Sequence, residues 1–329
     1  MSDTSKTVLV TGGAGYIGSH TCKLLAGEGY LPVTFDNLVY GHAHAVKWGP
    51  LEEGDLIDTA RVQAVLEQYK PIAVVHFAAY SYVGESVTDP AKYYGNNVGG
   101  TLSLLNAMRA AEVDKIVFSS TCATYGAPEQ LPIRETTPQN PINPYGKSKL
   151  MIEQMLADFD SAYGLRHVAL RYFNACGGDL DGEIGEEHDP ETHLIPLVLM
   201  SLTGEIPELT IFGTDYDTPD GTCIRDYVHV DDLARGHLLA LQHLFKGKPS
   251  DAFNLGSGDG FSVKQIIDAV ERVTGQTVPR KYGPRRVGDP PILTADISKA
   301  RSELGFTTSV SDVDTVVSSA WRFHQSRQR

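Results

Sequence analysis

The sequence predicts an α/β fold in which helices cover both faces of a parallel sheet. Short apolar runs of the buried-strand kind alternate with helix-like segments through the first half of the chain. Such alternation is typical of βαβ units, whose strands are parallel. The first run, at 7–10, leads into a glycine-rich turn and then a helix-like segment. A smaller α/β lobe is also expected, because the regular alternation ends near residue 178.

The glycine-rich turn after the first strand has the spacing of a dinucleotide-binding motif. Gly13, Gly15 and Gly18 form Gly-x-Gly-x-x-Gly, directly after Gly12. Glycines allow a tight turn and a close approach of backbone N–H groups to a pyrophosphate, whose charge the helix N-terminus favours. The second apolar run ends in Asp36, whose carboxylate suits the adenosine ribose and would repel a 2′-phosphate. The sequence therefore predicts a doubly wound, Rossmann-like sheet that binds NAD rather than NADP.

The remaining elements of this sheet follow the same alternation. Ligands bind beyond the carboxyl ends of the strands in doubly wound sheets, so the residues after each strand are candidates for the site. Helices are expected at 59–69, at 96–111 and from 144 onward, and strands near Trp48 and at 31–35, 72–77, 116–120 and 167–171.

The second half of the chain has a different pattern. Glycine and acidic residues from 179 to 189 predict a loop, and shorter strand-like and helix-like segments follow. Residues 226–259 contain apolar runs that we expect to rejoin the large sheet. The predicted organisation is an NAD-binding domain at 1–178, with 226–259 added to it, and a discontinuous substrate domain formed mainly by 179–329.

A tyrosine and a lysine lie four residues apart at the start of the helix expected from 144. Asn143 suits its N-cap and Pro144 its first turn. Tyr145 and Lys149 then share one helix face, about 6 Å apart along the axis. A phenol is a poor base at neutral pH unless a cation stabilises its phenolate, and Lys149 is such a cation. Taken alone, the pair also fits an ordinary amphipathic helix.

The composition excludes several classes of protein. Hydrophobic residues make up 41% of the 329 residues and charged residues 21%, which is typical of a soluble globular protein. No apolar run approaches the ~20 residues of a membrane span, and the net charge of −13 argues against a nucleic-acid partner. The N-terminus has no signal-like apolar stretch, and four scattered cysteines indicate reduced thiols. We therefore expect a cytoplasmic protein without a membrane partner.

Two pairs of histidines are candidates for metal ligands. They are His42 with His44, and His188 with His193. Neither pair has a companion carboxylate or thiolate at a familiar ligand spacing. They are interpreted as solvated loop histidines, and no metal site is predicted.

Together, the glycine turn, Thr121 and the Tyr145/Lys149 pair resemble the extended short-chain dehydrogenase/reductase family. Within that family the chain is most similar to the enzymes that epimerise UDP-sugars at C4, and the similarity runs nearly end to end. It is carried by Phe-Ser-Ser-Thr at 118–121, Asn-Pro-Tyr-Gly-Lys-Ser-Lys at 143–149, Arg-Tyr-Phe-Asn at 171–174, Arg-Asp-Tyr at 225–227 and Arg-Arg-Val-Gly-Asp at 285–289.

The resemblance implies an NAD-dependent 4-epimerase that interconverts UDP-glucose and UDP-galactose, most often as a homodimer. Tyr145, held as a phenolate by Lys149 and the nicotinamide charge, would remove the proton of the 4-hydroxyl. Hydride would pass to NAD, which stays bound, and return to the other face after the 4-ketosugar rotates. Thr121 would orient the hydroxyl and stabilise the developing oxyanion.

Arginine side chains are the expected phosphate ligands, because a guanidinium fork matches phosphate oxygens; Arg225, Arg285 and Arg286 are the candidates. The expected cofactor-binding residues are Gly12, Gly15, Tyr16, Ile17, Gly18, Asp36, Asn37, Asp55, Leu56, Phe77, Ala78, Ala79, Asn96, Thr121, Tyr145, Lys149 and Phe173. The expected substrate-binding residues are Thr121, Tyr145, Asn174, His193, Leu194, Thr210, Phe212, Arg225, Arg286 and Asp289.

Three positions depart from the pattern of the family. Ser81 stands where some members carry a lysine near the cofactor, His193 where asparagine is frequent, and Leu293 where others have tyrosine or a smaller residue. The sugar therefore stays open between a hexose, the UDP-xylose/UDP-arabinose pair and an N-acetylated hexosamine.

Two other functions remain as alternatives. One is a nucleotide-sugar dehydratase or decarboxylase on the same scaffold. Dehydratases of this family place an Asp-Glu pair after the threonine, whereas Cys122 and Ala123 follow Thr121 here. The other is a non-catalytic NAD-binding protein, but such proteins typically lack the Tyr/Lys pair.

Overall fold

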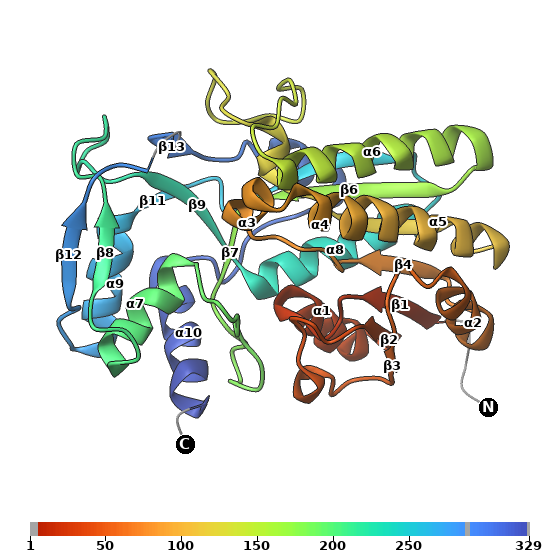
Figure 1. Cartoon of the computed structure of the whole chain (residues 1–329), viewed down its shortest axis with the longest axis horizontal. Helices are drawn as coiled ribbons and strands as arrows, with labels where there is room; N and C mark the ends of the chain where they lie inside the picture. Colours follow the sequence, from red (N-terminus) through yellow and green to blue (C-terminus); the bar gives the residue numbers. More distant parts are fainter. Residues whose placement is uncertain (1–5, 287–289, 328–329) are drawn as a thin grey trace.

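A seven-stranded parallel sheet forms the centre of the larger of two lobes in the computed structural model, which describes residues 6–286 and 290–327 (Figure 1). The strand order β3-β2-β1-β4-β5-β6-β10 reverses between β1 and β4, which confirms the predicted doubly wound sheet. The strands are β1 (Thr7–Thr11), β2 (Leu31–Asp36), β3 (Leu51–Glu53), β4 (Ala73–His76), β5 (Lys115–Ser119), β6 (Arg166–Tyr172) and β10 (Asp251–Leu255).

Helices cover both faces of this sheet (Figure 1). One face carries α2 (Thr59–Tyr69), α5 (Gly100–Ala110) and α6 (Pro144–Tyr163), and the other carries α1 (Tyr16–Gly27) and α8 (Val230–Phe245). Consecutive strand residues point to opposite faces. Accordingly, Val8 and Val10 pack in the core beneath α1 and α8, while Leu9 packs beneath α2 and α5. Burial on both faces explains why the three central residues of β1 are all apolar.

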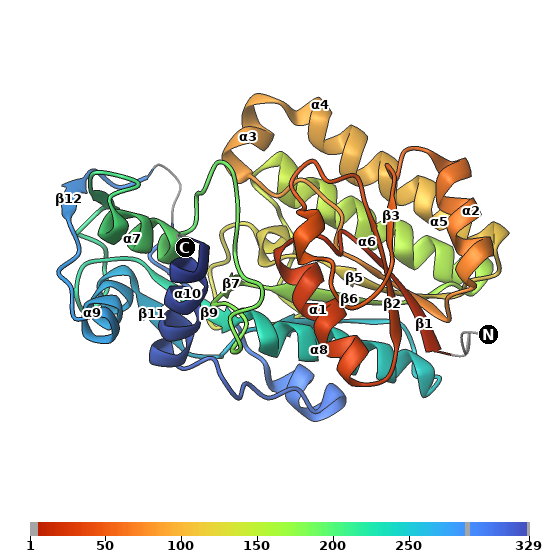
Figure 2. The same cartoon turned by 90° about the horizontal axis from the view of Figure 1, so that it is seen from below.

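The smaller lobe is assembled from segments that are not contiguous in the sequence. A four-stranded sheet joins β7 (Asn174–Cys176), β9 (Ile224–His229), β11 (Gly260–Ser262) and β13 (Ile292–Leu293), and a pair joins β8 (Leu209–Phe212) with β12 (Arg280–Gly283). Helices α7 (Leu194–Thr203), α9 (Val263–Thr274) and α10 (Val313–Arg327) complete its core. The connection from β7 to α7 runs between the two lobes (Figure 1, Figure 2).

The structure differs from the sequence prediction in three elements. From 226–259, α8 and β10 rejoin the large lobe as expected, but β9 pairs with β7, β11 and β13 in the small one. The strand expected near Trp48 lies at Leu51–Glu53, beyond Pro50, which has no N–H for a ladder. The helix expected at 96–111 consists of a π-helical segment, Tyr94–Gly99, followed by α5.

Short helical segments connect the main elements. These segments are η2 (Ala43–Ala45), α3 (Val83–Thr88), α4 (Pro90–Tyr93), η3 (Tyr94–Gly99), η4 (Cys122–Tyr125) and η5 (Ala300–Leu304).

None of the helices within the described ranges has the length and apolar character needed to cross a membrane.

Candidate active site

A cavity of about 400 Å³ opens at the carboxyl ends of the strands, where the strand order reverses. Gly12, after β1, has φ +74° and packs against the residues after β4, since a Cβ there would lie 2.6 Å from the backbone nitrogen of Ala78. A Cβ on Gly18 would lie 2.1 Å from the carbonyl oxygen of Gly12. The glycines therefore form a turn that no side chain can enter, as a pyrophosphate cradle requires.

The carboxylate of Asp36 is fixed at the rim of this cavity. It accepts hydrogen bonds from the backbone N–H groups of Ala14 at 3.0 Å and Leu38 at 2.9 Å. Burial raises the pKa of Asp36, and these N–H groups oppose that shift by stabilising the carboxylate. A buried acceptor at the end of β2 suits ribose hydroxyls.

All cofactor-binding residues expected from the sequence line this cavity. Ser81, one of the positions that departs from the family pattern, lines it too. The expected residues in its wall are Gly12, Gly15, Tyr16, Ile17, Gly18, Asp36, Asn37, Asp55, Leu56, Phe77, Ala78, Ala79, Asn96, Thr121, Tyr145, Lys149 and Phe173.

We expect Gly18→Ala to abolish retention of the dinucleotide, because the added methyl group would collide with the Gly12 carbonyl. Gly27→Ala, at the other end of α1, is the matched control, since nothing lies within 4 Å of a Cβ there. The measurement is cofactor content after gel filtration, with circular dichroism to verify folding. Equal retention by the two variants would contradict the role given to the turn.

The start of α6 is built as the sequence predicts and brings Tyr145 to the cavity. The Asn143 side chain caps the helix by accepting from the N–H of Gly146 at 2.8 Å, and Pro144 is its first residue. Thr121 caps η4 by accepting from the N–H of Ala123 at 3.1 Å, and it also hydrogen-bonds to Tyr145. Thr121 thus caps the backbone of η4 and also contacts the phenol of Tyr145.

Lys149 is buried one helical turn beyond Tyr145. Its Nζ donates to the carbonyl of Ser119 at 2.8 Å and lies 5.9 Å from the centre of the Tyr145 ring. Burial lowers the pKa of Lys149 to about 7, although the nearby charge of Glu153 opposes the shift. The ammonium is therefore easily discharged near neutral pH, unless a neighbouring anion stabilises it.

The environment of Tyr145 explains why the expected phenolate would need the nicotinamide charge in addition to Lys149. Burial raises the pKa of Tyr145 well above its ordinary value, and the hydrogen bond from Thr121 opposes this only in part. Removing the phenolate from water outweighs the effect of an ammonium that does not contact it. Lys149 alone therefore leaves the phenol neutral, and ionisation requires further positive charge beside the ring.

A buried ion-pair network that sequence analysis missed supports this site. Glu153 lies one turn beyond Lys149 and accepts from Arg171 Nε at 3.0 Å and Nη2 at 2.6 Å, and from Ser120 Oγ at 2.5 Å. Arg171 also donates to the Tyr125 hydroxyl at 2.9 Å. The network ties β5, β6 and α6 together. Its signal in the sequence was a glutamate at the helical spacing of four after Lys149.

A second cavity of about 400 Å³ adjoins the first and lies mainly in the small lobe. The guanidinium of Arg286 lies 4.5 Å from the centre of the Phe212 ring in its wall. Asp289 lies outside the described residues. Of the expected substrate-binding residues, Asn174, His193, Leu194, Thr210, Phe212, Arg225 and Arg286 line this cavity, and Thr121 and Tyr145 line the first.

Two residues singled out in the sequence point elsewhere. Arg285, expected as a phosphate ligand, instead pairs with Asp215 at 2.7 Å and lies over the Tyr216 ring at 4.5 Å. Adjacent residues of an extended segment point to opposite sides, so only one of two consecutive arginines enters the cavity. Leu293 packs on the apolar cluster that contains Phe173 and Ile297.

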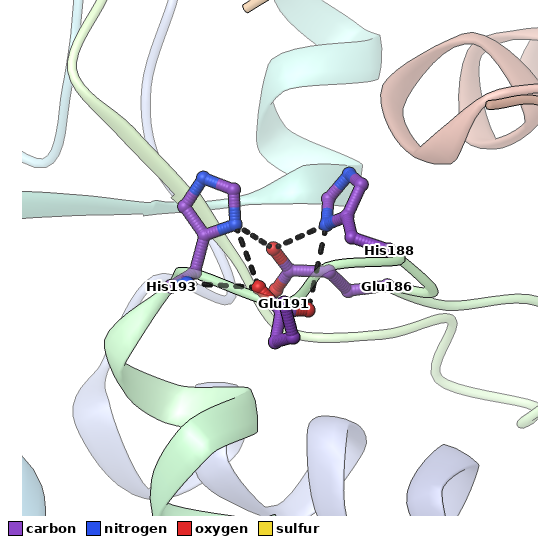
Figure 3. Close-up of side chains that lie close together, drawn as sticks. All are labelled: Glu186, His188, Glu191 and His193. Atoms are coloured by element: carbon purple, nitrogen blue, oxygen red, sulfur yellow. Dashed lines mark hydrogen bonds and ion pairs between the residues drawn. The ribbon is translucent and has the colours of Figure 1, made fainter. Parts of the chain in front are cut away.

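The expectation that His188 and His193 have no companion carboxylates is wrong, although His193 is exposed as expected. Both rings face Glu186 and Glu191 in the loop between β7 and α7 (Figure 3). The loop doubles back, so residues two to seven positions apart converge. Of the other pair, His44 lies 3.1 Å from a carboxylate oxygen of Glu187.

The fold and site define a class. Dinucleotide-dependent proteins of the short-chain dehydrogenase type have a doubly wound sheet with a glycine-rich turn and a carboxylate at the end of the second strand. They also carry Thr, Tyr and Lys side chains at the point where the strand order reverses. The sequence model of the NAD dependent epimerase/dehydratase family matches residues 8–256. The chain belongs to that family.

Individual relatives are similar over almost the whole chain. UDP-glucose 4-epimerase of Rhizobium leguminosarum bv. trifolii is 53% identical over 319 residues, which are 97% of each protein. The crystal structure of UDP-glucose 4-epimerase from Brucella ovis in complex with NAD is 58% identical, with a TM-score of 0.95 over 96% of this chain and 98% of that one. The enzyme from Bifidobacterium longum in complex with NAD+ and UDP is 40% identical, with a TM-score of 0.92 over 98% and 99%.

Proposed function

We propose that the protein is an NAD-dependent 4-epimerase that interconverts UDP-glucose and UDP-galactose. The observation that carries this proposal is the junction of the two cavities. Asn174 and His193 line both, with Tyr145 and Thr121 on one side and the two arginines, Arg225 and Arg286, on the other. A nucleotide diphosphate anchored at the arginines can therefore place its sugar at the phenol.

The residues present fit NAD as the cofactor. The turn at Gly12, Gly15 and Gly18 would hold the pyrophosphate, and the carboxylate of Asp36 would accept hydrogen bonds from the adenosine ribose. When bound, NAD supplies the acceptor and donor of a hydride. Burial raises the pKa of Tyr145, and a positive charge beside the ring would favour its ionisation. Oxidised nicotinamide carries such a charge.

The side chains of the site have separate tasks in epimerisation at C4. Tyr145 takes the proton of the 4-hydroxyl and later returns one to the same oxygen, as a general base and then a general acid. Thr121 holds the phenol oxygen and the sugar hydroxyl together. Lys149 supplies positive charge beneath the ring. Arg225 and Arg286 hold the part of the substrate that does not turn.

Dehydration is disfavoured by the residues after Thr121. Burial raises the pKa of Cys122 to about 12, so its thiol is neutral and inert. Ala123 has no acid–base group. Elimination of water needs an acid and a base at the sugar, and these positions supply neither.

Product analysis tests the proposal. Tag-free protein is incubated with UDP-galactose without added NAD, and UDP-glucose is measured by chromatography. We expect conversion to an equilibrium mixture, because retained NAD is regenerated in each turnover. A panel with UDP-xylose and UDP-N-acetylglucosamine identifies the preferred sugar, and failure with every UDP-sugar would contradict the proposal.

We expect Lys149→Met to move the acid limb of the pH–activity profile upward by roughly 1–3 pH units, the usual effect of one nearby charge. The shift is upward because the loss of a cation near the phenolate raises the pKa of Tyr145 further, so the base forms only at higher pH. Lys147→Met is the matched control, because Lys147 is exposed on the same helix. An unchanged profile for Lys149→Met would refute the electrostatic role.

We also propose a homodimer located in the cytoplasm. The exposed side chains of Leu102 on α5 and Met151 on α6 lie on the two helices that cover one face of the large sheet, which supports a self-association surface there. Cys22, Cys122 and Cys176 are free thiols, as expected in a reducing compartment. Sedimentation of Met151→Glu against the parent protein tests the surface.

A further inference from the structure

The loop between β7 and α7 gathers four potential metal ligands that the proposed reaction does not use. Glu186, His188, Glu191 and His193 follow one another at intervals of two, three and two residues. Glu186 and His193 line both cavities, and His188 lines the first. The cluster therefore stands at the boundary between the cofactor and substrate pockets.

The four side chains converge on one point. The two imidazole rings stand on opposite sides, and each turns Nδ1 toward the carboxylates between them (Figure 3). His193 Nδ1 lies 2.8 Å from Glu186 Oε1 and 3.0 Å from Glu191 Oε1. His188 Nδ1 lies 3.3 Å from Glu186 Oε1 and 3.5 Å from Glu191 Oε2.

These separations fit a tetrahedral metal site. Zinc bonds of about 2.0–2.2 Å to nitrogen and oxygen place neighbouring ligands about 3.3–3.6 Å apart in a tetrahedron. One ligand atom from each of the four side chains lies within 4.8 Å of all the others. Side-chain shifts on the order of 1 Å would therefore complete the coordination.

The surroundings of the carboxylates call for a cation. The side chains of Glu186 and Glu191 are 7% and 6% exposed, and two buried carboxylates are unfavourable without positive charge. Within the described parts of the chain, their ion pairs are with these two histidines alone. In addition, Nδ1 of His188 is buried and finds no hydrogen-bond partner of proper geometry.

A neighbouring acidic cluster differs because a lysine already neutralises it. Asp179, Asp181 and Glu183 surround the ammonium of Lys23, which lies 2.8, 2.9 and 2.7 Å from their carboxylates. Its cation is already part of the protein. Among residues 6–286 and 290–327, no lysine or arginine forms an ion pair with Glu186 or Glu191.

We propose that Glu186, His188, Glu191 and His193 bind one divalent transition-metal ion of the zinc class. Imidazole with carboxylate suits Zn²⁺ and related ions, whereas Mg²⁺ and Ca²⁺ prefer oxygen ligands alone. Four protein ligands make a closed, structural site. The ion fixes the loop that forms the shared wall of both cavities, and so it positions His193 and the start of α7.

The competing arrangement is a network without metal, in which two protonated imidazoles neutralise the carboxylates. The carboxylates raise the pKa of His188 to about 9 and that of His193 to about 10, against the effect of burial. A bound metal displaces these protons, so metal binding releases protons and weakens at low pH. This difference makes the two arrangements distinguishable.

Cobalt titration of the tag-free, chelator-treated holoenzyme tests the proposal. We expect one equivalent of Co²⁺ to give the intense visible bands of four-coordinate cobalt, and Zn²⁺ to abolish them. His188→Gln and Glu191→Gln should lose the bands while keeping the circular dichroism of the parent. His44→Gln and Asp181→Asn are matched controls, because they alter a histidine and an acidic residue outside the cluster and should bind as the parent does.

Two results would overturn the site. One is the absence of tetrahedral cobalt bands in the parent protein. The other is an equal cobalt signal in His188→Gln, Glu191→Gln and the parent, which would place the ion elsewhere. Histidine NMR with Zn²⁺ in excess is a second measurement, and rings that remain doubly protonated would establish the metal-free network. None of these measurements depends on epimerase activity, so their failure is separate from that of the proposed function.

Discussion

Tyr145→Phe is expected to lower kcat by about 10²–10⁴-fold, the usual contribution of a positioned general base. The substitution keeps the ring in the cavity wall and removes only the oxygen that takes the proton of the sugar hydroxyl. Cofactor and nucleotide should still bind, because the glycine turn and the arginines are elsewhere. The measurements are steady-state turnover of UDP-galactose, NAD content and UDP affinity.

Tyr163→Phe is the matched control for this prediction. Tyr163 ends the same helix, is half exposed and packs against the guanidinium of Arg109 outside the cavity. It should retain parental turnover. A Tyr145→Phe enzyme with comparable turnover would show that another group takes the proton.

Arg171→Met is expected to lower the free energy of unfolding by about 3–5 kcal/mol, because it leaves the carboxylate of Glu153 buried without its cation. The two side chains are only 8% and 9% exposed. The loss should appear as a fall of several degrees in the melting temperature and as reduced activity, since Glu153 lies on the helix that carries Tyr145 and Lys149.

Two further variants separate this charge effect from a general loss of packing. Arg134→Met breaks an ion pair with Asp296 whose arginine is 68% exposed, and it should cost less than about 1 kcal/mol. The double variant Arg171→Met/Glu153→Leu should regain part of the lost stability, because it leaves no buried charge uncompensated. A double variant less stable than Arg171→Met would show that charge compensation is not the main contribution of this pair to stability.

The sheet and the residues that line the first cavity could be predicted because their signals are local. The run at 7–10, the glycine spacing to Gly18 and the carboxylate of Asp36 each act over a few residues, and a parallel sheet then brings its strand ends together. The cap and first turn of α6 were equally local. Each of these features has the predicted place in the structure.

Other features depended on partners far away in the chain. Arg225 and Asp226 lie in a strand whose apolar pattern did not reveal which sheet it would join. Arg285 and Arg286 differ only in the direction of their side chains. The buried pair of Glu153 and Arg171 joins residues 18 positions apart.

The sequence by itself determined the fold class, the cofactor turn and the presence of Tyr145 and Lys149, because short-range backbone preferences and apolar periodicity set these features. Only the tertiary structure decided how those groups are charged and what surrounds them. Burial raised the pKa of the phenol and lowered that of the lysine, and a folded loop brought two histidines onto two carboxylates. Charge states and ligand geometry depend on dehydration and on contacts across the fold, and neither is written in the spacing of residues along the chain.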